Sequence, residues 1–106
     1  MMNLKYKIKP TITFENKELW IFNSELLQMD IQLIQDGIDS CQLTIEEKNI
    51  GLSWGLEVSE LKIGKEISIL TYHGKFVAEI PTIEIYNMLK AYRDKLKDYE
   101  NENNTS

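Results

Sequence analysis

Short stretches in which every second residue is hydrophobic recur along much of the chain. Near the start, Leu4, Tyr6 and Ile8 alternate with lysines, which places apolar side chains on one face of a β-strand and lysines on the other. Pro10 follows and cannot donate a hydrogen bond to a neighbouring strand. A lysine-lined strand beside a proline is typical of a protected sheet edge; a phosphate-binding row of lysines is the alternative.

The same period of two continues over residues 12–14, and a polar break at Asn16-Lys17 separates it from the next apolar run. That run, residues 19–22, suits a strand that is buried on both faces. Trp20 lies within it and is expected in the core. We therefore expect a first hairpin in this part of the chain.

Residues 24–35 fit two structures. Their apolar positions alternate with glutamine and aspartate, as in a strand, whereas Ser24 could instead cap the start of a short helix. We take the strand as the prediction. Asp36-Gly37 then gives a turn signal, so residues 26–46 are expected to form a second hairpin.

Further strands are expected after this hairpin. Apolar residues alternate over residues 52–58, where Gly51 and Gly55 interrupt the pattern as at a bulge or a close backbone approach. Gly64-Lys65 is the next predicted turn. Since the connections are too short for parallel crossovers, successive strands are expected to pair antiparallel.

The single histidine of the chain, His73, raises the question of catalysis or metal binding. Residues 67–72 and 75–80 are two β-rich runs with only His73-Gly74 between them. Two-residue hairpin loops favour positive φ at both central positions, which glycine accepts freely and histidine accepts more readily than most residues. His73 is therefore predicted to be a turn residue.

A C-terminal helix is predicted from Thr82 onward, after Pro81 closes the last strand. Thr82 is the expected N-cap, and Glu84 lies in the first turn, where the helix dipole favours negative charge. The apolar stripe that should cover one face of the sheet comprises Ile85, Leu89, Tyr92, Leu96 and Tyr99. The sequence thus predicts an α+β fold, with an antiparallel β-sheet meander of about six strands and one C-terminal helix packed on a sheet face.

Composition agrees with one small folded domain. The chain has 106 residues, of which 42% are hydrophobic and 27% charged, so we expect a single domain over residues 1–100 and a disordered polar tail over residues 101–106. There is no apolar run for a secretory signal or a membrane span, and the only cysteine, Cys41, is expected as a small apolar residue in a strand. The expected compartment is the cytoplasm.

Acidic residues are concentrated in the middle of the chain. The net charge is −5, but residues 21–60 alone carry eight acids and one lysine. A nucleic-acid-binding protein is expected to present a basic stripe instead. The distribution argues against nucleic acid as the partner and favours a protein with a basic surface.

Motifs that would indicate catalysis are missing from the sequence. It contains no phosphate-binding loop, dinucleotide fingerprint or nucleophile elbow. The closest acidic pairs lack the spacing of a calcium loop. We therefore expect a protein that is not an enzyme, with no catalytic residues, no metal and no cofactor.

Partner binding is the function that the residues favour. Trp54 lies near glycines and glutamates and is the candidate interface anchor, although its place in the alternating pattern favours the core. The expected electrostatic face consists of Asp36, Asp39, Glu46, Glu47, Glu57 and Glu60.

An acidic β-meander that ends in a helix such as TIEIYNMLKAYRDKLKDYE resembles small bacterial immunity proteins, including those of contact-dependent growth inhibition. This resemblance in architecture covers most of the chain and implies a non-enzymatic cytoplasmic protein that tightly binds one toxin domain, often a nuclease with a basic surface. The alternative is a small structural or regulatory protein that self-associates, for example as a homodimer.

Overall fold

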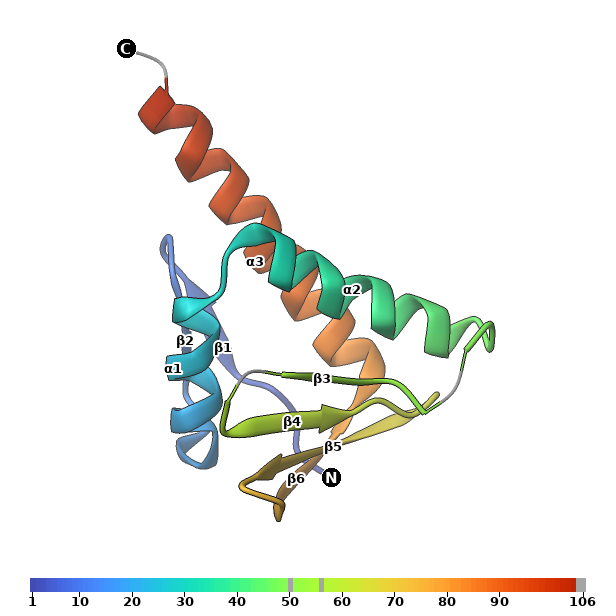
Figure 1. The fold of residues 1–106 in the computed structure, drawn as a ribbon. Coiled ribbons are helices and arrows are strands. Elements are labelled where there is room, and N and C mark those ends of the chain that lie inside the picture. The colour runs from blue at the N-terminus through green and yellow to red at the C-terminus, as the bar shows by residue number, and fades with distance from the viewer. Residues whose placement is uncertain (50, 56, 105–106) are drawn as a thin grey trace.

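The chain forms an α+β fold with two antiparallel sheets and a long C-terminal helix (Figure 1). This computed structural model describes residues 1–49, 51–55 and 57–104, with side chains up to residue 101. The helices within those ranges are α1 (Trp20–Gln28), α2 (Ile31–Ile45) and α3 (Thr82–Asn104), and a 3-10 turn (Lys17–Leu19) leads into α1. The strands are β1 (Tyr6–Ile8), β2 (Ile12–Phe14), β3 (Ser53–Gly55), β4 (Ser59–Lys62), β5 (Ile67–Tyr72) and β6 (Lys75–Pro81).

The larger sheet has the order β3-β4-β5-β6, with each strand antiparallel to the next. This confirms the expected pairing of successive strands in the second half of the chain. His73 and Gly74 form the β5–β6 turn with φ values of 49° and 78°, so the predicted role of His73 as a turn residue is also confirmed. In Figure 1, α2 and α3 cross one another on one side of this sheet, while α1 and the β1–β2 hairpin stand together at one end.

The prediction of a single six-stranded meander is wrong. β1 and β2 form a separate two-stranded sheet, in which Tyr6 pairs with Phe14. Strands and a hairpin are predicted between residues 17 and 46, but residues 17–28 form the 3-10 turn and α1, and residues 31–45 form α2. Asp36-Gly37, the predicted hairpin turn, lies in the middle of α2.

Two helices form here because the buried residues follow a helical spacing. Phe22 and Leu26 are buried four residues apart in α1, and Ile34, Ile38 and Cys41 are buried at steps of four and three in α2. The strand-like alternation spans the junction between the two helices. At that junction Asp30 is the N-cap of α2, and its side chain accepts a hydrogen bond from the Leu33 backbone N–H at 2.9 Å.

A glycine occurs inside α2 because an indole ring occupies the space beside it. A Cβ atom on Gly37 would lie 2.6 Å from Cε2 of Trp54. The same indole donates from Nε1 to the backbone oxygen of Leu33, at 2.9 Å. Trp54 therefore joins α2 to the edge strand β3 through both packing and a hydrogen bond.

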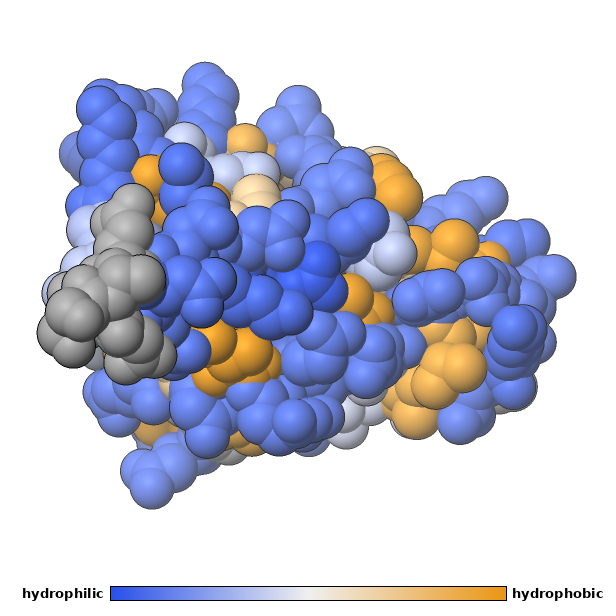
Figure 2. Space-filling view, turned by 90° about the horizontal axis from the view of Figure 1, so that it is seen from above, coloured by the Kyte–Doolittle hydropathy of each residue, from blue (hydrophilic) through white to orange (hydrophobic). Residues whose placement is uncertain are grey.

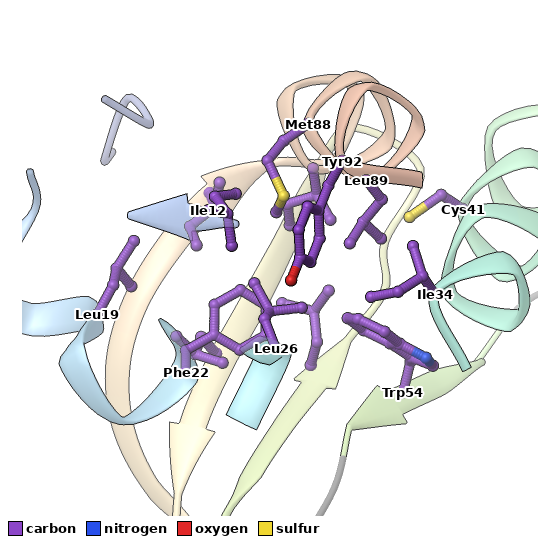
Figure 3. Close-up of a cluster of buried hydrophobic side chains, with 14 of the residues drawn as sticks. Ile12, Leu19, Phe22, Leu26, Ile34, Cys41, Trp54, Met88, Leu89 and Tyr92 are labelled. Atoms are coloured by element: carbon purple, nitrogen blue, oxygen red, sulfur yellow. The ribbon is translucent and has the colours of Figure 1, made fainter. Parts of the chain in front are cut away.

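The core lies between the helices and the inner faces of the sheets (Figure 3). Of the stripe predicted for α3, Ile85, Leu89 and Tyr92 are fully buried, Leu96 is partly buried, and Tyr99 is half exposed. The helix continues through residues 101–104 of the predicted disordered tail, and residues 105–106 of that tail lie outside the described residues.

Thr82 has a different role from the predicted N-cap. It is the first residue of α3 and is fully buried, and its hydroxyl donates to the Gly64 carbonyl at 2.6 Å. The Ser68 hydroxyl lies 2.7 Å from the Thr82 hydroxyl and is hydrogen-bonded to it. Thr82 thus ties the start of α3 to the β4–β5 connection and to β5.

The N-terminal segment is hydrogen-bonded to β6 and to the first turn of α3. The Met2 backbone N–H donates to the Glu79 carbonyl on β6, and the Leu4 N–H donates to Oε1 of Glu84 in the first turn of α3. The bond to Glu79 covers part of the free edge of β6, which reduces its capacity to pair with another strand.

Candidate protein-interaction surfaces

The exposed face of α2 carries three carboxylates that are held by neighbouring glutamines. Each acid accepts a hydrogen bond from the glutamine four residues before it, as expected for neighbours on one helix face. The bonds run from Gln32 Nε2 to Asp36 Oδ1 at 2.9 Å, from Gln35 Nε2 to Asp39 Oδ1 at 2.9 Å, and from Gln42 Nε2 to Glu46 Oε1 at 3.1 Å. These bonds restrict the rotamers of the acids.

The predicted acids differ in whether they form a salt bridge. Glu46 pairs with Lys48 at 3.1 Å and Glu47 with Lys65 at 2.8 Å. The hydrogen bond from Gln42, and then the neighbouring Lys48, lower the pKa of Glu46, and the hydrogen bond and charge of Lys65 lower the pKa of Glu47. Within the described ranges, no salt bridge involves Asp36 or Asp39.

The six predicted acids do not form one continuous face. Glu60 lies on β4 between the buried residues Ser59 and Leu61, so its side chain points from the sheet face opposite the core. Glu57 lies in the β3–β4 connection, beside α1. Asp36 and Asp39 share the exposed face of α2, and Glu46, the C-cap, follows at its end; this face belongs to the mainly hydrophilic surface seen from above in Figure 2.

Of the two tryptophans, Trp54 lies in the core, as its place in the alternating pattern favoured, and Trp20 does not. Trp20, expected in the core, is 70% exposed, whereas Trp54, the candidate anchor, is 7% exposed and belongs to the core. The expectation for Trp20 is wrong because residues 20–28 are helical, and the buried stripe of Leu19, Phe22 and Leu26 leaves Trp20 on the outer side.

A pocket of about 370 Å³ opens beside Trp20. It lies between α1 and the connection from β3 to β4, and it combines apolar, neutral polar and acidic side chains. The lining consists of Trp20, Ile21, Ser24, Glu25, Gln28, Glu57 and Val58. This volume is at the small end of the range for ligand sites, about 300–1,000 Å³.

Glu25 is a buried carboxylate in the lining of this pocket and is only 7% exposed. Its Oε1 accepts from the backbone N–H groups of Val58 at 3.2 Å and Ser59 at 2.9 Å, and from the Ser59 hydroxyl at 3.2 Å. Its Oε2 is buried and has no hydrogen-bond partner in the described part of the chain. The side chain thus links α1 to β4 and keeps one acceptor unused.

Sequence reasoning missed both Glu25 and the exposure of Trp20. The signal was present in the spacing of Leu19, Phe22, Leu26 and Met29, which are all buried and follow one another at steps of three and four. A helix drawn through these positions puts Trp20 outside the buried stripe and Glu25 beside it.

The cysteine and the groups that could ligate a metal are the remaining reactive side chains. Cys41 is buried in α2, not in a strand as expected, and burial raises the pKa of its thiol to about 12. Such a thiol carries almost no nucleophilic thiolate at neutral pH. In residues 1–49, 51–55 and 57–104, no three His, Cys, Asp or Glu side chains are grouped so that they could hold a metal ion.

No family model, curated protein or solved structure matches this chain. Among the helices that the structure describes, none has both the length and the apolar character needed to cross a bilayer.

Proposed function

We propose that this protein is a non-enzymatic binding protein of the immunity type, which neutralises a toxin domain with a basic surface, such as a nuclease, in the cytoplasm. The exposed face of α2 supplies the carboxylates that attract the partner. Affinity comes from apolar contacts made after the encounter.

The observation that carries this proposal is the state of Asp36 and Asp39. Both are exposed, both are held by a glutamine one turn earlier, and neither belongs to a described salt bridge. Fixed carboxylates outside a salt bridge keep more of their charge available to a partner than Glu47, which is paired with Lys65. Among the described residues, Arg93 approaches Asp39 only through Gln35, whose Oε1 accepts from the guanidinium at 3.0 Å. Preorganised charges of this kind steer association and cost little side-chain ordering on binding.

The test begins with the reading frame next to the gene. Cells that express this frame alone should lose viability, and co-expression of the present protein should restore it. With the purified pair, the association rate should fall as salt increases, since the attraction is screened. The double variant Asp36→Lys/Asp39→Lys should lower this rate by about tenfold or more.

The matched control is Glu79→Lys, a charge reversal at an exposed position of β6 on the sheet. It should change the association rate much less than the α2 variant does. Equal effects of the two variants, or an association rate indifferent to salt, would remove the role of the α2 face. A toxic neighbour that this protein neither binds nor neutralises would contradict the proposed function.

A second candidate function is self-association through the outer face of the four-stranded sheet. Ile69 and Phe76 are 38% and 64% exposed and lie on neighbouring strands, and Ile67 on β5 is also exposed. An apolar group on an uncovered sheet face can form a dimer interface. Light scattering would show a dimer that Phe76→Ser dissociates, whereas a monomer at high concentration rejects this candidate.

A further inference from the structure

The pocket beside Trp20 combines two carboxylates with an exposed aromatic ring. Glu25 and Glu57 both line it, and none of its lining residues is a lysine or arginine. The remaining polar groups are the Ser24 hydroxyl and the Gln28 amide. The lining is therefore complementary to a positively charged group.

Glu25 provides a reason for this pocket to bind a hydrogen-bond donor. Three donors from Val58 and Ser59 hold its Oε1, while its Oε2 has no partner among the described residues. A buried acceptor without a hydrogen bond is unfavourable. Because Oε2 is itself buried, a donor in the pocket reaches it only after a small shift of the pocket wall, and that contact would supply the missing bond.

Trp20 determines which cation fits best. The side chain is 70% exposed and lines the same pocket, so the indole is accessible to a ligand. A planar guanidinium can stack on an indole and donate in its own plane to carboxylates, which an ammonium group cannot do. Trp and Arg are also the residue types most enriched in the energetic centres of protein interfaces.

We propose that this pocket binds the guanidinium group of an arginine side chain on the partner protein. The guanidinium stacks on Trp20 and donates hydrogen bonds to Glu25 and to Glu57. This deepens the proposed function and rests on it for the identity of the partner, because a toxin with a basic surface presents such side chains. The chemistry of the pocket can be measured without the partner.

The experiment is an NMR titration of the full-length protein with N-acetylarginine amide. We expect saturable shifts of the Trp20 indole N–H and of the Val58 and Ser59 amides. The Trp54 indole N–H is the internal control, because it is bonded to Leu33 in the core and should not move. N-acetylcitrulline amide, which has nearly the same shape without the charge, should give no saturable shift.

Two variants test the named contacts. Trp20→Ala and Glu57→Gln change exposed residues and should each weaken binding of the arginine probe about two- to fivefold. Glu60→Gln is the matched control, because Glu60 is exposed on β4 and does not line this pocket. Its affinity should equal that of the unmodified protein.

Three results would overturn the inference: no saturable shift with the arginine probe, equal binding of the citrulline probe, or equal binding of N-acetyllysine amide. These results are independent of the rescue test. Arginine binding without rescue by co-expression would support the arginine pocket and reject the immunity function. Rescue without arginine binding would support the immunity function and reject the arginine pocket.

Discussion

Trp20 and Trp54 show how the same residue type serves two different purposes in this molecule. Trp54 points inward from β3, fills the space beside Gly37 and donates to the Leu33 carbonyl. Trp20 begins α1 on its outer side, is 70% exposed and lines a pocket with Glu57. The indole of Trp54 is packed and hydrogen-bonded by other residues of the fold. The indole of Trp20 is largely exposed, and Glu25 Oε2 in the same pocket lining has no hydrogen-bond partner among the described residues. We infer that Trp54 supports folding and Trp20 supports binding.

The comparison predicts a large difference in stability between two alanine variants. Trp54→Ala removes a buried side chain and should lower the free energy of unfolding by about 3–5 kcal/mol. Trp20→Ala changes an exposed side chain and should stay within about 0.5 kcal/mol of the unmodified protein. Urea denaturation followed by far-ultraviolet circular dichroism measures both. Similar losses for the two variants would contradict the division of roles.

The contact between α2 and Trp54 can also be tested by a substitution in the helix. Gly37→Ala should lower the free energy of unfolding by about 1–3 kcal/mol, because the added methyl group overlaps the indole. In a Trp54→Leu background the indole is gone, so the same change should lower the free energy of unfolding less. The helix propensity of alanine, which exceeds that of glycine by about 1 kcal/mol, is then no longer opposed by the overlap. A double-mutant cycle gives the coupling, and a value near zero would show that the two residues do not act together.

The sequence predicted the second half of the fold better than the first. The strands β5 and β6 are long enough for alternation to be clear, and His73-Gly74 specifies their turn by backbone conformation alone. Between residues 17 and 46, two short helices meet at Met29 and Asp30, and the apolar residues near this junction alternate by coincidence. Asp36-Gly37 added a false turn signal, because Gly37 makes room for the indole of Trp54, a residue far away in the sequence.

For the candidate site, the sequence indicated an excess of acidic residues but not which of them share a surface. An excess of acids in residues 21–60 was visible, but which acids share a surface depends on helix faces and strand sides. Asp36 and Asp39 lie together on α2, whereas Glu60 projects from the outer face of β4. The pocket at Glu25 depends on Val58 and Ser59, more than thirty residues further along the chain, so no local pattern could indicate it.

The smallest expected effect concerns the exposed ion pair between the turn that follows α2 and the β4–β5 connection, which contrasts with the buried contact made by Trp54. Lys65 pairs with Glu47 at 2.8 Å, and its hydrogen bond and charge lower the pKa of Glu47 from the ordinary value of 4.5. A lowered pKa stabilises the fold at pH values above 4.5, and this contribution disappears as the pH falls through the folded-state pKa. Since both side chains are exposed, the contribution is small.

Lys65→Met should therefore return the pKa of Glu47 towards its ordinary value and leave the urea midpoint at pH 7 almost unchanged. A pH titration of the glutamate side-chain carbons by NMR measures this pKa. Glu46 is the internal control, because Gln42 and Lys48 lower its pKa and neither residue is altered. If Lys65→Met destabilised the protein as much as Trp54→Ala does, the exposed ion pair would contribute as much to stability as the buried indole, and the distinction drawn between the two contacts would be wrong.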